Sequence, residues 1–468
     1  MANRKKTPSK SRKAAAKKAA KKPTRTSAKK ARGSAAKKQN ARDPKKTAPK
    51  KTSRKTAKKA APKKGAKKAA PKKAAPKKAA PKKGNRKPAK RAPRKAAATN
   101  AAAGPRPKKV KRVCILTGGG DAPGLNAVLR GFVKHAHELD IDVFGAEDGF
   151  TGLIEPGGFR RLRPMDVRGI LPRGGSVLGC SNRANPFSYP VGEKGEEELV
   201  DVSDRVVRRL KDNDIDILVL VGGDGTMAMG MRFQEMGIPV VGIPKTIDND
   251  LAATDFTFGL DTAVTTATWA IDALHTTAEA HDRVMILELM GRYAGWISLS
   301  AGIAGGADVI LIPEIPYDVE RVAKKIRQRS ELGATFSIVV VGEGARPKEG
   351  TVSTISEGRE GHLPRLGGAG HRLAAELDGM VPHEIRTTVL GHIQRGGSPS
   401  SFDRLLGTRF GVAAAELCKE RRTGRLVSLR GTSIVSAPLE EATAEPKLVA
   451  PDGQLVKAAR AVGIELGG

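Results

Sequence analysis

The same short pattern occurs twice along this chain: an apolar run, a glycine-rich turn and then a helical pattern. Residues 113–117 (VCILT) lead through three glycines into a predicted helix over about residues 125–138, and residues 215–221 lead through GGDGT into another helical pattern. Further apolar runs of strand length lie at residues 240–243, 284–289, 309–312 and 337–341. Apolar strands that alternate with helices predict an α/β fold with mostly parallel sheets, whose ligands lie at the carboxyl ends of the strands.

Composition separates this α/β body from the segment before it. Residues 1–112 hold 46 of the 85 Lys and Arg residues but one of the 48 acids, Asp43, and contain no aromatic residue. The sequence AAPKK occurs three times in a row over residues 69–83. Such a segment buries too little apolar surface to offset its ordering entropy, and its charges repel one another. We therefore predict a disordered Lys/Ala/Pro-rich tail over residues 1–109, similar in composition to the C-terminal part of linker histones, and a folded body over residues 110–468.

The body is longer than one hydrophobic core usually extends, so we expect it to form two lobes. Its three cysteines, Cys114, Cys180 and Cys418, are too few and too scattered for a disulfide framework, which favours a reducing compartment. No apolar run is long enough to span a bilayer. We expect a cytoplasmic protein that makes no contact with a membrane.

Two glycine-rich segments are candidates for phosphate binding. Residues 117–124 (TGGGDAPG) follow a predicted strand and open a helix, so their backbone amides and the helix N-terminus favour an anion, although a tight turn would use the same residues. Asp224 lies in the second segment, residues 222–226. A carboxylate beside a phosphate requires a cation, which favours Mg²⁺ with a nucleotide, whereas the plainer reading is a helix cap. Similar GGDGT loops occur in NAD kinases and diacylglycerol kinases.

An acidic segment and several arginines complete the set. Residues 244–250 (PKTIDND) place two acids at the end of another strand, and transfer of a phosphoryl group to an alcohol needs a carboxylate that accepts the hydroxyl proton. Met290-Gly291-Arg292 follows a strand, and residues 391–399 (GHIQRGGSP) contain His392 and Arg395. Guanidinium groups suit phosphate binding, although one arginine alone is more often part of a surface ion pair.

The order of these motifs, GGDAPG, GGDG, PxTIDND, MGR and GHIQRGGSP, resembles the phosphofructokinase family from about residue 113 to beyond residue 409. The resemblance implies two Rossmann-like lobes and a 6-phosphofructokinase of glycolysis. The implied reaction moves a phosphoryl group from Mg-ATP to the 1-hydroxyl of fructose 6-phosphate. It also implies an oligomer, commonly a homotetramer.

The resemblance assigns roles to individual residues. Asp248 is implied as the general base and Asp224 as the Mg²⁺ ligand. The implied catalytic residues are Asp248, Thr246, Arg292 and Gly120. The implied substrate-binding residues are Asp250, Arg283, Met290, Gly291, Glu343, Arg386, His392 and Arg395, with Arg283 and Arg386 reaching the 6-phosphate from a neighbouring subunit. The implied nucleotide-binding residues are Gly120, Arg183, Gly223, Asp224, Gly225, Thr226 and Lys245.

Two positions bear on the phosphoryl donor. Lys245 stands where ATP-dependent bacterial members usually have Gly, and it resembles the pyrophosphate-dependent branch. Gly225 stands where that branch usually has Asp, whose carboxylate would block the α-phosphate of a nucleotide. A carboxylate against a phosphate is the stronger obstacle, so we favour ATP and keep pyrophosphate as the alternative donor.

The effector site of an allosteric phosphofructokinase is matched only in part. Arg130 and Lys134 match two of the family's basic effector residues, but His275 stands in place of an arginine. No lysine occurs in residues 332–336, where the family carries a pair. The sequence therefore does not support the family's usual control by phosphoenolpyruvate and ADP.

The tail predicts a second activity. Its density of Lys and Arg favours binding to the backbone of DNA or RNA, or to polyphosphate, without sequence preference. The absence of aromatic residues argues against base stacking. Such binding would associate the protein with the nucleoid. A nucleoid-binding scaffold with an inactive kinase body is the rival hypothesis, but Asp224, Thr246, Asp248 and Arg292 are all present.

Overall fold

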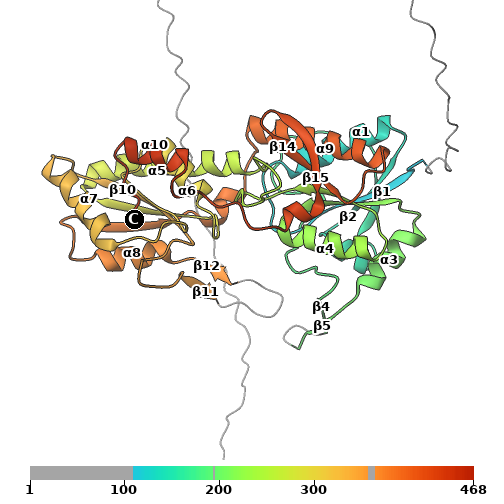
Figure 1. Ribbon diagram of the computed structural model, residues 1–468, viewed down its shortest axis with the longest axis horizontal. Helices are drawn as coiled ribbons and strands as arrows, with labels where there is room; N and C mark the ends of the chain where they lie inside the picture. Colours follow the sequence, from blue (N-terminus) through green and yellow to red (C-terminus); the bar gives the residue numbers. More distant parts are fainter. Residues whose placement is uncertain (1–108, 193–195, 357–363) are drawn as a thin grey trace, which may run out of the picture. The chain divides into compact units, whose positions relative to one another are not determined.

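The computed structural model of the protein describes residues 109–192, 196–356 and 364–468 (Figure 1). The prediction of a disordered tail over residues 1–109 falls almost wholly outside the described residues. The prediction of two lobes with mostly parallel sheets is confirmed, because the body contains a seven-stranded and a four-stranded sheet.

The larger sheet has the strand order β15-β14-β7-β6-β1-β2-β3. Its strands are β1 (Arg112–Thr117), β2 (Asp142–Ala146), β3 (Phe159–Leu162), β6 (Ile217–Gly222), β7 (Val240–Pro244), β14 (Arg425–Arg430) and β15 (Ser433–Pro438). The five central strands run parallel, with Val113 opposite Ile217 and Leu218 opposite Val240, and the two edge strands pair antiparallel. All six residues of β6 are buried, because helices cover both faces of the sheet.

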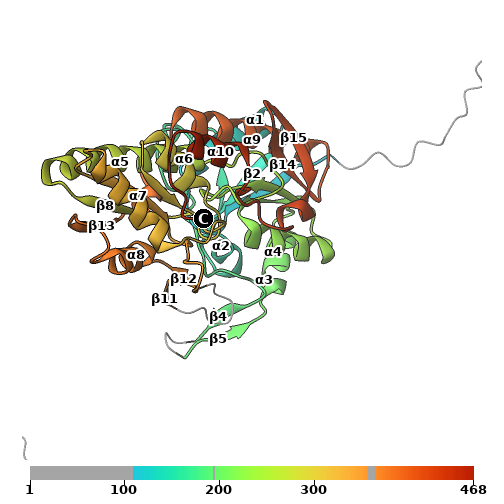
Figure 2. The same ribbon diagram turned by 60° about the vertical axis from the view of Figure 1, so that its left-hand side comes forward.

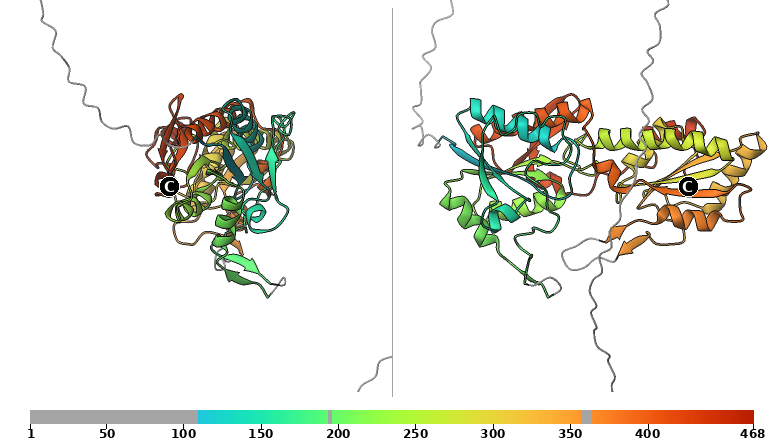
Figure 3. Two further views of the ribbon diagram at one scale, coloured as in Figure 1. Left: turned by 90° about the vertical axis from the view of Figure 1, so that its right-hand side faces the viewer. Right: turned by 180° about the vertical axis from the view of Figure 1, so that it is seen from behind.

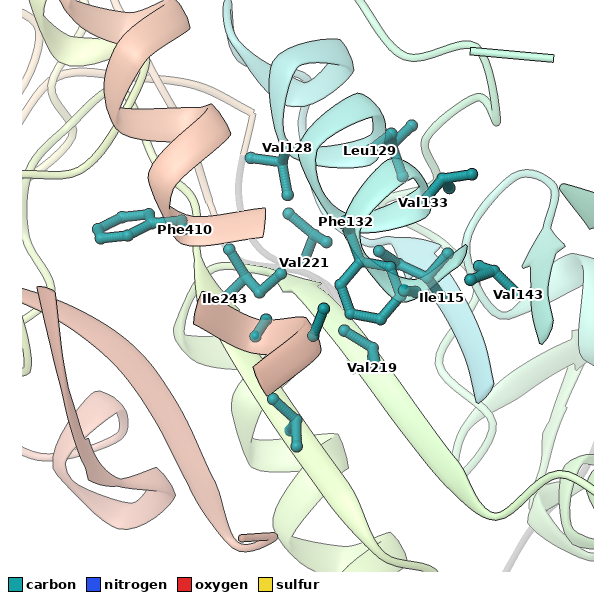
Figure 4. Close-up of a cluster of buried hydrophobic side chains, with 14 of the residues drawn as sticks. Ile115, Val128, Leu129, Phe132, Val133, Val143, Val219, Val221, Ile243 and Phe410 are labelled. Carbon is teal, nitrogen blue, oxygen red and sulfur yellow. The ribbon is translucent and has the colours of Figure 1, made fainter. Parts of the chain in front are cut away.

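Alternate residues of these strands enter two separate cores. Ile115, Val219 and Ile243 face α1 (Leu125–Glu138) and α9 (Ser401–Lys419) in the cluster of Figure 4. Cys114 and Leu220 face the other side. That side is covered by α2 (Thr151–Ile154), α3 (Ser203–Asp212), α4 (Asp224–Glu235) and η2 (Leu439–Ala442). The view from behind in Figure 3 shows α1, in cyan, and the green helices on opposite faces of this sheet.

The smaller sheet has the order β13-β8-β10-β9 and is parallel throughout. Its strands are β8 (Val284–Leu289), β9 (Val309–Leu311), β10 (Ser337–Gly342) and β13 (Ile385–Val389). One face packs on α5 (Leu260–His281), α6 (Trp296–Ala304) and α10 (Gln454–Ala461). The other face packs on α7 (Val319–Glu331) and α8 (Ala369–Leu377), so this lobe also has three layers (Figure 1).

Two short antiparallel ladders and a second 3-10 helix, besides η2, lie outside the sheets. The ladders are β4 (Tyr189–Val191) with β5 (Glu198–Val200), drawn below α3 in Figure 2, and β11 (Thr354–Ser356) with β12 (Arg365–Leu366). The 3-10 helix η1 (Gly391–Arg395) follows β13 and carries His392. Within the described ranges, no helix combines the length and the hydropathy needed to cross a membrane.

Candidate functional site

Three of the predicted motifs meet at the carboxyl ends of neighbouring strands of the larger sheet. The Gly118 amide, after β1, donates to the carbonyl of Val221 in β6 at 2.9 Å. The Lys245 amide, after β7, donates to the carbonyl of Gly222 at 2.9 Å. The parallel order β1-β6-β7 therefore brings residues 118–120, 222–226 and 245–250 to one edge, as the strand pattern predicts.

The loop after β1 forms one wall of a cavity. Gly119 has a φ of 73°, a left-handed conformation that favours glycine, and its amide donates to the Ser181 carbonyl at 3.1 Å. The cavity has a volume of about 330 Å³. It is lined by Gly119, Gly120, Asp121, Gly175, Ser176, Cys180 and Asn182. Cys180 and Asn182 were not predicted as site residues, although they adjoin the predicted Arg183, which is exposed.

The second glycine-rich loop, residues 222–226, leaves open space beside Gly225. Gly223 is the N-cap of α4, and Asp224 lies exposed in the first turn, so the Asp224 carboxylate is not the helix cap. A Cβ atom added at Gly225 would meet no atom within 4 Å. Thr226 is buried beneath the two glycine loops. An exposed carboxylate beside open space suits a cation that accompanies a phosphate.

Asp248 lies in the third loop as a buried carboxylate with an unpaired atom. The residue is 4 % exposed, and its Oδ1 atom is buried without a hydrogen-bond partner among the described residues. Burial raises the pKa of Asp248, Arg395 opposes the shift, and Glu343 reinforces it. An unsatisfied buried carboxylate oxygen is costly. Asp403 and Glu314 also carry one, so it is the place of Asp248 at the strand ends, beside the two glycine-rich loops, that indicates a functional position.

The pKa values of two residues near Asp248 in the loop are also shifted. Burial and the charges of Asp248 and Asp224 raise the pKa of Asp250 to about 6. Burial lowers the pKa of Lys245 to about 8, and the Lys245 ammonium donates to the Gly120 carbonyl. The hydroxyl of Thr246 accepts from the Asp248 amide at 3.0 Å. One edge of the sheet therefore carries a carboxylate that can accept a proton and a cation that can face an anion.

The smaller sheet supplies the predicted basic residues from its own carboxyl ends. Glu343, after β10, accepts from the amides of Gly291 and Arg292, after β8, at 3.3 and 3.0 Å. Arg395, in η1 after β13, donates to the Asp121 carbonyl at 2.9 Å. The Arg395 guanidinium therefore reaches the glycine loop of the larger sheet. Met290 precedes this loop, and His392 is exposed in η1.

Arg283 and Arg386 lie at the other end of the smaller sheet. They stand at or near the first residues of β8 and β13, and both contact Glu384, with 2.5 Å between Arg283 Nε and the Glu384 carboxylate. A six-residue strand separates Arg283 from Met290, a distance of roughly 20 Å. The structure therefore does not bring these two arginines to the other site residues of the same chain, and their role toward a neighbouring subunit stays a prediction.

The carboxylates fit an Mg²⁺ ion that is shared with a ligand. Asp224 and Asp250 are close enough for the charge of Asp224 to raise the pKa of Asp250. Across the part of the chain that the structure describes, no group of three or more His, Cys, Asp or Glu residues could hold a metal ion. Mg²⁺ is commonly bound by one or two carboxylates together with substrate phosphates, which agrees with this arrangement.

Comparison with known proteins gives matches over almost the whole body. The family model described as phosphofructokinase matches residues 112–418. An ATP-dependent 6-phosphofructokinase of Chloroflexus aurantiacus is 49% identical over 361 residues, which is 77% of this chain and 98% of the relative. A pyrophosphate–fructose 6-phosphate 1-phosphotransferase of Streptomyces coelicolor is 49% identical over 349 residues, 73% of this chain and 96% of the relative. The crystal structure of Pichia pastoris phosphofructokinase in the T-state matches with a TM-score of 0.62 at 29% identity, covering 77% of this chain and 37% of that chain.

Proposed function

Because this chain belongs to the phosphofructokinase family, we propose that it transfers the γ-phosphoryl group of Mg-ATP to the 1-hydroxyl of fructose 6-phosphate, giving fructose 1,6-bisphosphate in glycolysis. The observation that carries this proposal is Asp248, a buried carboxylate with an unpaired oxygen at the edge where both lobes present their motifs. A carboxylate of this kind suits a general base that waits for a substrate hydroxyl.

The chemical step uses groups from both lobes. Asp248 takes the proton of the sugar 1-hydroxyl while the oxygen forms a bond to the γ-phosphorus, and the bond from that phosphorus to the bridging oxygen of ADP breaks. Arg292 and Thr246 face the charge that develops on the transferred group, and the amide of Gly120 holds the donor phosphates. Asp224 would hold Mg²⁺ together with the donor phosphates, and the ion would supply positive charge beside the nucleotide.

The remaining residues bind the two substrates. Glu343, His392 and Arg395 bind fructose 6-phosphate together with Asp250, Met290 and Gly291. The loop of Gly223, Gly225 and Thr226 binds the nucleotide, with Lys245 and Arg183 at its margins. In this proposal Arg283 and Arg386 bind the 6-phosphate in a site of the neighbouring subunit, so the enzyme is an oligomer, and the family resemblance favours a homotetramer.

Open space at Gly225 supports ATP as the donor. A Cβ atom there would meet nothing, so a nucleotide α-phosphate has room, and relatives named as ATP-dependent match at 49% identity. Lys245 and the Streptomyces coelicolor relative support pyrophosphate as the alternative donor. The ammonium group of a lysine attracts both ATP and pyrophosphate. The free space at Gly225 is needed only by ATP, which is the larger donor.

The test is an assay of the full chain for fructose 1,6-bisphosphate, with Mg-ATP and with Mg-pyrophosphate in parallel. Turnover with ATP and none with pyrophosphate is the expected result. Turnover with pyrophosphate alone would overturn the choice of donor. A folded protein that is silent with both donors would support the rival hypothesis of a scaffold with an inactive body.

We further propose that the basic tail binds DNA, RNA or polyphosphate and associates the enzyme with the nucleoid. The charge of residues 1–112 supports this, because they hold 46 Lys and Arg residues and one acid. In a gel-shift titration we expect the full chain to bind DNA of any sequence, with an affinity that falls steeply as salt rises. No shift at low salt would refute the proposal.

A further inference from the structure

Lys447 directs its ammonium group at the loop that carries Asp248. The residue lies between η2 and α10, and its Nζ atom donates to the Thr254 carbonyl at 2.8 Å, to the Asp255 carbonyl at 2.9 Å and to Asn249 Oδ1 at 3.1 Å. An ammonium group has three protons, so these three acceptors use all of its donors. A lysine on the surface usually donates to water, whereas all three Nζ donors of Lys447 bind protein oxygens.

Asn249 is the point through which these contacts reach the two carboxylates. It lies between Asp248 and Asp250, is 2 % exposed and has a φ of 55°, a left-handed conformation that a non-glycine residue rarely adopts. Its Oδ1 atom also accepts from the Thr257 amide at 3.1 Å. Lys447 and Thr257 thus hold the side chain of Asn249. The backbone of Asn249 in turn determines where Asp248 and Asp250 point.

The backbone of residues 447–449 also binds the loops of the site. The Lys447 amide donates to the Asp250 carbonyl at 2.8 Å. The Lys447 carbonyl accepts from Trp296 Nε1 at 2.8 Å, and Glu314 Oε1 accepts from both the Val449 amide and the Gly295 amide, at 2.8 and 2.9 Å. Gly295 and Trp296 follow the loop of Arg292. The segment therefore joins the loop of the general base to the loop of the arginine.

We propose that Lys447 is a positioning residue for phosphoryl transfer, which holds the loop of residues 248–250 in its reactive conformation. The inference rests on the proposed function of Asp248. All three donors of the Lys447 ammonium go to protein acceptors, so its loss should act through the position of the loop rather than through a direct contact with a ligand. A misplacement of about 1 Å is enough to lower kcat by ~10²-fold.

The first experiment compares Lys447→Met with Lys457→Met in the full chain. Lys457 is exposed on α10, ten residues further on, and serves as the matched control. We expect Lys447→Met to lower kcat by ~10–100-fold while KM for ATP changes by less than about threefold, and any change in KM for fructose 6-phosphate would come from Asp250 in the same loop. Lys457→Met should leave both constants unchanged. If Lys447→Met retains the wild-type kcat, or changes KM alone, the inference is wrong.

The second experiment separates positioning from general stability. In an Asp248→Asn background, adding Lys447→Met should lower the residual kcat no further, because the group that it positions is already absent. An equal loss in both backgrounds would show a purely structural role and overturn the inference.

If Lys447→Met does not fold, Lys447→Gln keeps two N–H donors and should lose about three- to tenfold in kcat. A wild-type kcat in Lys447→Gln would likewise overturn the inference. If the wild-type enzyme is inactive with both ATP and pyrophosphate, the proposed function is refuted together with the inference.

Discussion

At the scale of single residues, the environment of Asp248 favours reactivity at a cost in stability. Its carboxylate is buried, and one oxygen lacks a partner among the described residues. Because burial raises the pKa of Asp248 above the ordinary value of 3.8, the ionised form is less favourable in the folded chain than in the unfolded chain. The carboxyl therefore lowers stability at pH values above 3.8, and this loss is absent below that pH.

The first prediction concerns Asp248→Asn. The substitution keeps the shape of the side chain but removes the base, so we expect kcat to fall by ~10²–10⁴-fold. Because it also removes a buried charge, we expect Tm to rise at pH 8 and to rise less as the pH is lowered toward 3.8, where the carboxyl is protonated in both states. Steady-state assays and calorimetry measure the two effects. A variant with normal kcat would exclude Asp248 as the base.

The second prediction concerns the donor site. Gly225→Asp places a carboxylate in open space beside the proposed α-phosphate, so we expect kcat/KM for ATP to fall by at least ~10²-fold. Gly225→Ala is the matched control. It adds a Cβ atom that meets nothing and suits a helix, so ATP turnover should stay within about threefold of wild type. Equal losses in both variants would indicate a steric effect of the Cβ atom rather than charge.

At the scale of elements, Glu343 connects the ends of two parallel strands. It follows β10, and its carboxylate accepts from the amides of Gly291 and Arg292 after β8. It also raises the pKa of Asp248, whereas Arg395 and Arg292 lower it. Burial is the main cause of the raised pKa of Asp248, and the loops after β8, β10 and β13 modify the pKa of this residue, which follows β7 in the other lobe.

The third prediction tests this coupling. Asp248 acts as a base only when it is ionised, so kcat/KM should fall as the pH decreases through its pKa. Glu343→Gln removes a negative neighbour and keeps an oxygen for the two amides. The pKa of Asp248 should decrease, and the acid limb of kcat/KM should move to lower pH. Comparison with wild type under the same conditions cancels the titration of the substrate, and an unmoved limb would contradict the prediction.

At the scale of the whole molecule, the role proposed for Arg283 and Arg386 would make each site depend on two subunits. Both contact Glu384 at the edge of the smaller sheet opposite Arg292 and His392. If each site takes its general base from one subunit and these arginines from a neighbour, two inactive variants can complement one another.

The fourth prediction uses this arrangement. Asp248→Asn and Arg386→Ala should each have low activity at moderate fructose 6-phosphate. Co-expressed and randomly mixed, the two chains should regain about a quarter of the wild-type sites, since one subunit in two supplies each intact group. Hybrid oligomers with no more activity than the separate variants would show that each subunit carries a complete site.

The sequence by itself determined the order and type of the main elements and the identity of the motif residues. Apolar runs at residues 113–117 and 337–341 predict buried parallel strands because a strand covered on both faces needs no polar alternation. Glycines after such strands predict loops that approach an anion. These features are local in the chain, so a local pattern reveals them.

Only the tertiary structure decided which of these residues meet. It showed that Asp248 has an unpaired buried oxygen, that Cys180 and Asn182 line the cavity, and that Arg283 lies far from Arg292. It also showed that Lys447 binds Asn249 across 198 positions of sequence. No short segment signals such contacts, because they depend on how two sheets and their helices pack, and burial and pKa depend on that packing.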